Sequence, residues 1–297
     1  MSRSRNFALA AGLSIVSLAV VVACTDDHPI VSRQTTPVDI PDARAPASDS
    51  SLPDNDAAAS PDASPVDPCK GRVLCDSFES AAVGGAPNAP WKVLQNSGTV
   101  SVSTTRAHTG THSVKLTTTA NQYQRAMITT AGAPLFPVAN NTLYGRMYAW
   151  LENAAGHDVH WNMISASGAV AGKSGVSASY NYGGQLDTFM ANYDTSGAST
   201  DCWKHSATGM PIGKWVCFAW KLAGPTNEMQ LFTDSGELAD MHVTNKGEGC
   251  LANDLGGVWM APAFANASVG WESVQNDPGH TMYIDDVTFD DKPLACP

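Results

Sequence analysis

Apolar and polar residues alternate with a period of two over many short stretches after residue 98. This pattern predicts β-strands, because successive side chains of a strand point to opposite faces of the sheet. Strands are predicted at residues 99–103, 112–119, 143–152, 159–165, 215–222, 228–233 and 280–289. Turn-rich stretches such as 181–184 and 234–236 separate them. Because helical periodicity is nearly absent, the sequence predicts an all-β domain, a β-jelly-roll sandwich.

The predicted strand at 143–152 has two very different faces. One face carries Leu143, Gly145, Met147, Ala149 and Leu151, and the other carries Tyr144, Arg146, Tyr148, Trp150 and Glu152. Three aromatic rings around an arginine are unusual on a solvent-exposed face. They suit a sugar, whose ring stacks on aromatic side chains and whose hydroxyls need hydrogen-bonding groups. We therefore predict that Tyr144, Tyr148 and Trp150 bind substrate; in the alternative interpretation, they form a second packed layer.

The first 23 residues have the organisation of a signal peptide. Arg3 and Arg5 form a basic start, and residues 7–23 form an uncharged apolar stretch of 17 residues. The segment Val21-Val22-Ala23-Cys24 resembles a bacterial lipobox, which implies cleavage before Cys24 and lipidation of its thiol. We therefore expect an exported lipoprotein, anchored to the membrane by its acyl chains, in the cell envelope or at the cell surface. The alternative is an ordinary secretory signal with a chance cysteine.

Residues 24–68 combine the lipidated cysteine with a predicted disordered linker. Between residues 25 and 68 there are eight Pro, nine Asp and no aromatic residue. Such a segment buries too little apolar surface to offset the entropy lost on ordering, so an extended tether is expected. The remaining 229 residues, 69–297, suit one sizeable all-β domain.

The predicted domain is acidic, with 13 Lys and Arg against 19 Asp and Glu, which gives a net charge of about −6. No overall basic surface for nucleic acid is present, although a local basic patch in a cleft could still bind an anionic polymer. Six cysteines follow Cys24, and an even number in an exported chain suggests three disulfides. A metal site is the alternative use of these cysteines, but no C-x-x-C pair supports it.

A series of short motifs follows the domain in order. It comprises Phe78-Glu79-Ser80, residues 99–102 and 107–113, Tyr144-Gly145-Arg146-Met147, His160, Gly183-Gly184-Gln185, Asn192-Tyr193, residues 215–218, Gly270-Trp271-Glu272 and residues 284–287. This set of motifs runs over almost all of residues 75–290. In order and spacing it resembles the fungal and bacterial cellulose-induced secreted protein family. The fold of that family is similar to the fold of glucuronan and alginate lyases. The resemblance implies a concanavalin-like, polysaccharide-lyase-like jelly roll with a concave sheet that forms a cleft.

The same resemblance implies a structural Ca²⁺ where the first strand, the turn after the second strand and the last strand meet. Glu79, Ser113 and either Asp285 or Asp286 would supply oxygen ligands, together with the loop at 108–113. Adjacent acids on a strand point to opposite faces, so only one of the two aspartates is expected to reach the ion. In the alternative interpretation, these acids only solvate a strand end.

The resemblance also implies candidates for polysaccharide lyase chemistry, in which a base removes the proton beside a uronate carboxylate and the glycosidic oxygen leaves. Arg146 and Gln185 would hold and neutralise the carboxylate. His160 would act as the base or a second neutraliser, and Tyr193 as the base or acid. Three further residues are expected to bind substrate at the cleft: His205, Trp271 and Glu272. A purely structural role for His160, Gln185 and Tyr193 is equally compatible with the sequence.

Two competing chemistries find no support in the sequence. No strand carries the E-x-D-x-E pattern of jelly-roll glucanases, and no G-x-S-x-G elbow of serine hydrolases is present. The leading hypothesis is a monomeric, extracytoplasmic lipoprotein that binds a uronate-containing, acidic polysaccharide; whether it also cleaves the polymer by β-elimination is left open. The alternatives are a non-catalytic carbohydrate-binding lipoprotein and an adhesive surface module.

If Cys24 is the lipidated residue, the Cys24→Ser variant should remain an unprocessed precursor, because serine has no thiol to acylate. Radiolabelled palmitate should enter the wild-type protein and a Ser14→Ala control, but not the Cys24→Ser variant. Persistent labelling of Cys24→Ser would contradict the prediction.

Overall fold

The computed structural model describes residues 69–196, 201–244, 249–250 and 261–297. The predicted signal peptide at 1–23, Cys24 and the linker that follows it lie outside these residues, so the predictions made for them stay predictions. Over the part of the chain that is described, no helix is long and apolar enough to cross a membrane.

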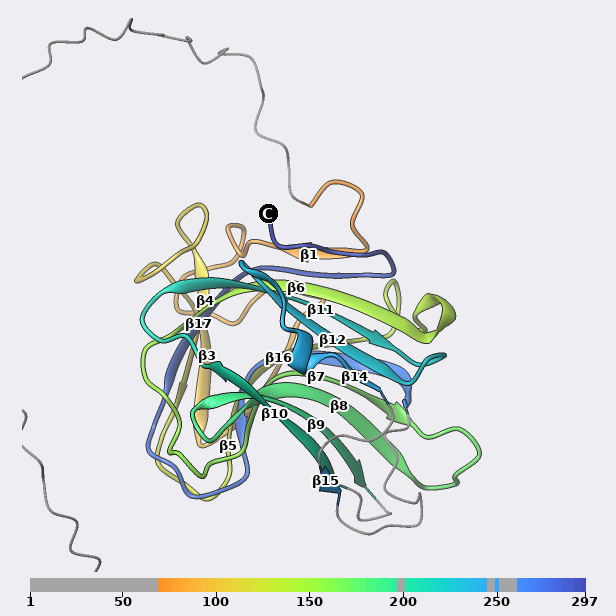
Figure 1. Ribbon diagram of the computed structural model, residues 1–297. Coiled ribbons are helices and arrows are strands. Elements are labelled where there is room, and N and C mark those ends of the chain that lie inside the picture. The colour runs from red at the N-terminus through yellow and green to blue at the C-terminus, as the bar shows by residue number, and fades with distance from the viewer. Residues whose placement is uncertain (1–68, 197–200, 245–248, 251–260) are drawn as a thin grey trace, which may run out of the picture. The chain divides into compact units, whose positions relative to one another are not determined.

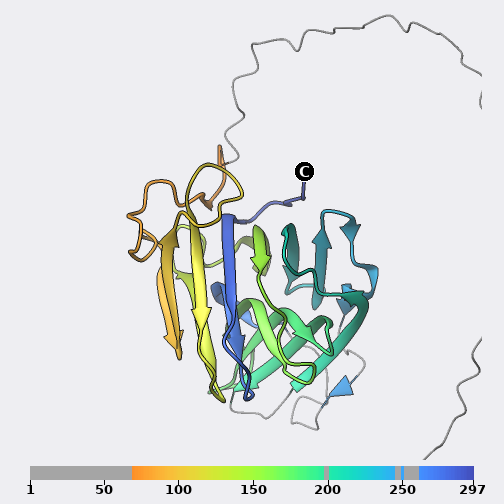
Figure 2. The same cartoon turned by 90° about the vertical axis from the view of Figure 1, so that its left-hand side faces the viewer.

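The described residues form two antiparallel sheets that face each other (Figure 1). Sheet A has the strand order β13-β12-β11-β6-β17-β4-β3, with β1 paired to β17 and β14 paired to β12. Its strands are β1 (Leu74–Asp76), β3 (Gly98–Ser103), β4 (Ser113–Thr118), β6 (Thr142–Leu151), β11 (Trp215–Ala223), β12 (Glu228–Thr233), β13 (Gly236–Glu237), β14 (Val243–Thr244) and β17 (Thr281–Asp290). Figure 2 shows β4 (yellow), β17 (blue) and β6 (light green) side by side.

Sheet B has the strand order β15-β10-β9-β8-β7-β16-β5-β2. Its strands are β2 (Lys92–Asn96), β5 (Gln124–Ala131), β7 (Trp161–Ala169), β8 (Ser177–Gln185), β9 (Thr188–Ser196), β10 (Asp201–Gly209), β15 (Gly249–Cys250) and β16 (Ala263–Ser273). Two short 3₁₀ helices, η1 (Ala139–Asn141) and η2 (Ala239–Met241), lie in connecting segments. This arrangement confirms the predicted all-β sandwich.

The core lies between the sheets and is filled by alternate residues of the facing strands. On β6, every second residue from Leu143 to Leu151 is buried, and the residues between them are half-buried. On β9, the inward-facing side chains are Phe189, Ala191 and Tyr193. The period of two seen in the sequence is therefore the period with which side chains enter the core.

All seven predicted strands are present with shifted ends, and the predicted turn at 234–236 links β12 to β13. The prediction of a turn at 181–184 is wrong, because these residues lie inside β8. A Cβ atom on Gly183 would lie 1.9 Å from the Trp161 carbonyl oxygen, so the glycine allows neighbouring strands to approach closely. The glycines that allow this close approach are also residues typical of turns, which explains the wrong prediction.

Five of the cysteines after Cys24 are disulfide-bonded, as predicted for an exported chain. Cys69 bonds to Cys75, and Cys217 bonds to Cys296. Cys202 is also disulfide-bonded. The Cys217–Cys296 bond fastens the C-terminal segment to β11 of sheet A.

Replacement of Gly145 should test how tightly the core of sheet A is packed. In Gly145→Ala, the new Cβ would lie 2.0 Å from Cζ2 of the buried Trp220 ring, so the ring or the strand must shift. We expect a loss of about 3 kcal/mol in the free energy of unfolding, measured by urea denaturation. Gly209→Ala is the matched control, because its nearest neighbour is 3.8 Å away, and it should change stability little. Equal stability of the two variants would contradict this account.

Candidate functional site

The aromatic row of β6 lies on the outer face of sheet A, and other parts of the chain cover it. The Tyr148 ring stacks on His108 with 3.4 Å between the ring centroids, and the Arg106 guanidinium lies 4.2 Å from the centre of the Trp150 ring. Tyr144 lines a small hollow together with residues of the C-terminal segment. These contacts fit the alternative interpretation, in which Tyr144, Tyr148 and Trp150 form a second packed layer and not a sugar-binding face.

The four predicted catalytic residues do not meet at one site. Arg146 lies in the same row of sheet A, where its Nη1 donates a hydrogen bond to the Ala295 carbonyl oxygen. Tyr193 belongs to β9 of sheet B, but its side chain faces the core and is 0% exposed. Only His160 and Gln185 come together at one hollow. A lyase site that uses all four residues is therefore incompatible with this fold.

Two rows of mostly polar residues cross sheet B on its outer face, which points away from sheet A. Within each row, every residue lies opposite the next one on the neighbouring strand. The first row is Thr129, Ser268, Ser165, Asn181, Asn192 and Trp203. The second row is Arg125, Glu272, Asn162, Gly183, Met190 and His205. Many of these residues line two adjoining hollows, which we call the first and second hollow and, together, the polar groove.

The first hollow has a volume of about 280 Å³ and is lined mainly by serine and asparagine side chains. At its edge, Arg125 Nε donates to Glu272 Oε1 at 2.7 Å, and the Tyr123 hydroxyl donates to the same oxygen at 2.8 Å. Burial, and then the hydrogen bond to Glu272, raise the pKa of Tyr123 to about 12. Glu272 therefore balances the arginine charge, and Tyr123 stays protonated at neutral pH.

The second hollow has a volume of about 230 Å³ and adjoins the first at two asparagines. Asn181 Nδ2 donates to Asn192 Oδ1 at 3.1 Å, and Asn192 Nδ2 donates to the Cys202 carbonyl at 3.2 Å. Because these amides are buried in the sheet to 3% and 1% exposure, their orientation is fixed before any ligand binds. Trp203 is half-buried and lines the same hollow, so it offers an aromatic surface next to the amides.

Two histidines and a glutamine lie at the second hollow. His205 Nε2 is 3.1 Å from Gln185 Oε1, and Gln185 Nε2 donates to the Asp158 carbonyl at 3.0 Å. His160 lines the hollow, with its Nε2 3.3 Å from Asn162 Oδ1. The predicted residues His160, Gln185 and His205 thus lie close together, which places imidazole and amide groups beside one another.

Glu272 and Trp271, both predicted to bind substrate, lie on opposite faces of β16. Glu272 lines the first hollow, as expected for a substrate-binding residue. Trp271 is 1% exposed and stacks on Trp161 with ring centroids 4.1 Å apart, so its predicted contact with substrate is wrong. Trp271 packs in the core beneath the polar groove.

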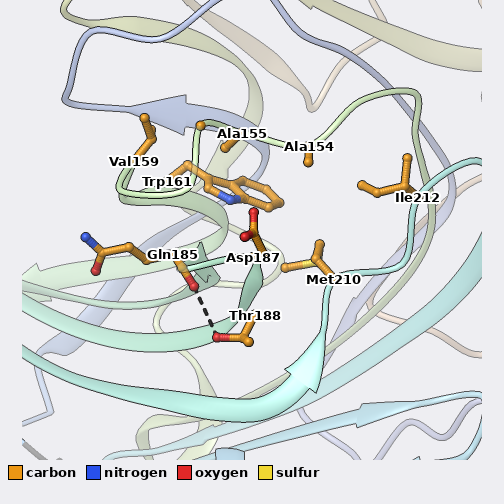
Figure 3. A pocket seen from close by; sticks show the side chains of 10 residues that line it. Ala154, Ala155, Val159, Trp161, Gln185, Asp187, Thr188, Met210 and Ile212 are labelled. Atoms are coloured by element: carbon orange, nitrogen blue, oxygen red, sulfur yellow. Dashed lines mark hydrogen bonds between the residues drawn. The ribbon is translucent and has the colours of Figure 1, made fainter. Parts of the chain in front are cut away.

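An apolar pocket of about 190 Å³ lies beyond the second hollow (Figure 3). Its wall includes Val159, Trp161, Met210 and Ile212, and Gln185 lines both this pocket and the second hollow. In Figure 3 the indole ring of Trp161 lies at the centre of the wall, and the side chains of Met210 and Ile212 point toward it from one side. The pocket therefore borders the polar groove at Gln185 but differs from it in polarity.

The residues predicted to bind Ca²⁺ gather around the loop between β3 and β4. Glu79 Oε1 accepts hydrogen bonds from the backbone N–H groups of Thr111 and His112 at 2.9 and 2.7 Å. Asp285 Oδ2 accepts from the backbone N–H of His108 at 2.8 Å. Ser113 is fully buried, and its hydroxyl donates to the Arg106 carbonyl. Three distant parts of the sequence therefore meet at this loop.

The expectation that Asp285 and Asp286 point to opposite faces is wrong. A β-bulge interrupts the register after Asp285, and Asp286 has a φ of 48°. As a result, both carboxylates contact the loop: Asp285 binds backbone N–H groups, and Asp286 Oδ1 accepts from the Thr109 hydroxyl at 2.7 Å. Bulges of this kind carry no clear signature in the strand pattern.

Oxygen groups of the kind that bind a hard divalent cation gather at this loop, but among the described residues Glu79, Asp285 and Asp286 do not hold their ligand atoms within 4.8 Å of one another. Burial, and then the charge of Asp286, raise the pKa of Asp285 to about 7. The hydrogen-bond donors at Asp285 are backbone N–H groups, which carry no full positive charge. Asp286 Oδ2, in contrast, lies 2.7 Å from His108 Nδ1. Carboxylate and carbonyl oxygens are the ligands that Ca²⁺ prefers, and a bound ion would supply positive charge next to Asp285.

Several groove residues escaped prediction, although β9 contained a usable signal. Phe189, Ala191 and Tyr193 alternate with Met190 and Asn192 along the strand. Because side chains of a strand point to alternate faces, Tyr193 belongs to the apolar face and Asn192 to the other face. The polar outer rows of the other strands consist of isolated serines and asparagines. Only the strand register, which the sequence does not give, brings such residues together.

Comparisons with known proteins agree with the sandwich fold. The structure of the cellulose induced protein Cip1 is similar, with a TM-score of 0.55 and 22% identity over 75% of this chain and 100% of that chain. At this identity the likeness shows the fold alone. Two other structures are too distant to support an argument. One is a botulinum neurotoxin serotype C1 binding domain, with 8% identity over 77% of this chain and 50% of that chain and a TM-score of 0.45. The other is a family 22 carbohydrate binding module of Clostridium thermocellum Xyn10B, with 14% identity over 76% of this chain and 97% of that chain and a TM-score of 0.38.

No curated protein sequence matches the chain. Residues 78–292 match the family described as "Polysacc_lyase-like: Cip1-like, core domain". The match covers well over half of the 297 residues and almost the whole described sandwich. The chain therefore belongs to the Cip1-like core-domain family of polysaccharide-lyase-like proteins.

Proposed function

We propose that this protein binds a polysaccharide along the polar groove of sheet B. The observation that carries the proposal is the pair of polar rows that cross the outer face of the sheet and end near Trp203. Sugars are recognised by fixed hydrogen-bonding groups together with an aromatic surface, and the groove offers both. Its amides are held in place by the sheet itself, so little ordering entropy is lost on binding.

The charge of the polar groove supports a neutral or weakly charged glycan better than a strongly acidic one. Arg125 is the cationic side chain among the residues that line the two hollows, and Glu272 already pairs with it. Asp194 is a second acidic residue that lines the first hollow. A uronate-rich polymer would therefore find little net positive potential in this groove.

β-Elimination is the second candidate function, supported by His160, Gln185 and His205 at the second hollow. In this reaction an imidazole would take the proton beside a uronate carboxylate, a C=C bond would form as the bond to the glycosidic oxygen breaks, and the imidazolium would return its proton to the departing oxygen. Gln185 or Asn192 would hold the carboxylate, because Arg146 lies on the other sheet. Amides stabilise the developing charge less than a cation does, which makes binding without cleavage the stronger proposal.

The protein is proposed to work outside the cytoplasm as a lipid-anchored lipoprotein. The disulfides Cys69–Cys75 and Cys217–Cys296 support this location, since such bonds persist in oxidising compartments. We also propose a structural Ca²⁺ at Glu79, Asp285 and Asp286, where it would join β17 to the β3–β4 loop and to the segment after β1.

Substitutions in the polar groove should weaken retention on a glycan. Trp203→Ala removes the aromatic surface and Asn192→Ala removes a fixed amide, so each should weaken binding about tenfold, by roughly 1.4 kcal/mol. Retention can be measured by affinity electrophoresis over a panel of neutral and acidic polysaccharides. Tyr148→Ala is the matched control from sheet A and should leave retention unchanged.

The same assay separates the candidate functions. Each polysaccharide is also monitored for the absorbance of unsaturated uronate products. Retention without product supports binding alone, and product that disappears in His160→Ala or His205→Ala supports β-elimination. Loss of retention in Tyr148→Ala with full retention in Trp203→Ala would move the site to sheet A and overturn the proposal.

Calcium should stabilise the domain in a pH-dependent way. At a free concentration of 100 times its Kd, the ion adds about 2.7 kcal/mol, which corresponds to a rise of about 5–10 °C in Tm. The pKa of Asp285 is raised to about 7 from its ordinary value of 3.8, so the metal-free protein loses stability as pH rises through 7. Ca²⁺ binds the ionised form, so the calcium-induced rise in Tm should be larger at pH 8 than at pH 5.5. Two results would contradict the proposed calcium site: an unchanged melting curve after chelation of calcium-loaded protein, or a calcium-induced rise in Tm that is equally large in Glu79→Ala.

A further inference from the structure

The apolar pocket beside the second hollow is lined mainly by apolar side chains, so it suits a less polar part of a ligand than the polar groove does. Val159, Trp161, Met210 and Ile212 form much of its wall, and Asp187 and Thr188 add polar groups (Figure 3). We propose that this pocket binds a hydroxylated aromatic substituent, of the hydroxycinnamoyl ester class, that is carried by the polysaccharide in the polar groove. This inference rests on the proposed polysaccharide binding and narrows its substrate class.

The size and lining of the pocket fit one aromatic ring. An apolar cavity of roughly 150 Å³ holds a benzene molecule, and the apolar pocket has about 190 Å³. Met210 brings a polarisable sulfur to the wall, which makes favourable contacts with aromatic rings. Trp161 is 3% exposed because it stacks on Trp271, so only a small part of its indole completes the wall. An acetyl or methyl group would leave most of this volume unfilled.

Asp187 supplies the polar partner that a phenolic hydroxyl needs. Asp187 lines the pocket, and its side chain is 61% exposed. One carboxylate oxygen, Oδ2, is 2.6 Å from His157 Nδ1, and this contact raises the pKa of His157. The carboxylate can still accept a hydrogen bond from a ring hydroxyl, since each of its oxygens has two lone pairs.

The backbone around Asp187 is held in an unfavourable conformation. Leu186 and Asp187 have φ values of 54° and 62°, in the left-handed region that bulky residues rarely adopt. The hydrogen bond from Leu186 N to the His157 carbonyl, at 2.7 Å, holds this turn in place. Leu186 and Ile212 are also 40% and 38% exposed, so apolar surface is displayed beside the pocket at a local energetic cost.

The pocket and the polar groove meet at Gln185. Its side chain is fixed on both sides, by His205 Nε2 at 3.1 Å and by the Asp158 carbonyl at 3.0 Å. Gln185 lines the second hollow as well as the apolar pocket. A sugar in the second hollow could therefore direct an ester-linked ring past Gln185 into the apolar pocket.

The test uses the full-length protein and two pairs of ligands. Arabinoxylan with hydroxycinnamoyl esters is compared with the same polymer after mild alkali, which removes the esters. Methyl 4-hydroxycinnamate is compared with methyl cinnamate, which lacks the hydroxyl. Retention on the polymers is measured by affinity electrophoresis, and binding of the small esters by NMR titration.

The wild-type protein should be retained on the esterified polymer about tenfold more strongly than on the de-esterified one. Ala154→Trp fills the pocket from an exposed position and should abolish this preference without changing retention on the de-esterified polymer. Ala171→Trp, at an exposed alanine outside the pocket lining, is the matched control and should keep the preference. Asp187→Ala, which removes the acceptor, should lose the preference, of about fivefold, for the hydroxylated small ester.

Two results would overturn the inference: equal retention of both polymers by the wild-type protein, or a preference that survives in Ala154→Trp. Retention on the de-esterified polymer reports on the proposed function separately, because that polymer lacks the aromatic substituent. If neither polymer is retained, the proposed polysaccharide binding fails for this glycan. The titration of methyl 4-hydroxycinnamate then tests the pocket by itself. Binding to the wild type that is lost in Ala154→Trp supports the proposed site, and no binding to the wild type contradicts it.

Discussion

The stack of Trp161, Trp271 and His280 is the contact on which the arrangement of the site depends. Trp161 and Trp271 stack at 4.1 Å, and Trp271 and His280 stack at 4.0 Å. His280 Nε2 is 2.5 Å from Asp277, whose other carboxylate oxygen accepts from Gly156 N at 3.0 Å. The stack thus joins β7, β16, the segment before β17 and the loop before β7. Because the next residues on β7 and β16 are Asn162 and Glu272, this core contact sets the position of groove residues.

The sequence contained enough information for the sandwich and for its core. Strict alternation, as on β6, predicts a strand with one buried face, and burial in the structure follows it residue by residue. Strands of sheet B were harder to find because both of their faces include buried or small residues, as on β8 with its two glycines. There the local pattern resembles a turn, and only contact with β7 explains why glycine is needed.

The candidate site was predictable only in part, because it depends on which face and which sheet each residue joins. His160, Gln185, His205 and Glu272 were identified and do lie in or beside the polar groove. The arginine between aromatics on β6 predicted a ligand at Arg146, but in the structure the C-terminal segment lies against this side chain, and Nη1 donates to the Ala295 carbonyl. A disulfide holds that segment on sheet A, and no strand pattern encodes such a cover.

The hydrogen-bonding capacity of the polar groove gives a further reason to expect a sugar rich in hydroxyls. Asn181 Nδ2 already donates to Ser179 and to Asn192, so the amide oxygen is the group it offers to a ligand. Glu272 and Asp194, on the same face, are also acceptors when ionised. A carboxylate cannot donate to any of these groups, whereas a sugar hydroxyl can donate to one and accept from a neighbouring serine. The acceptor-rich surface therefore selects hydroxyls over carboxylates, which agrees with the paired charge of Arg125 in the first hollow.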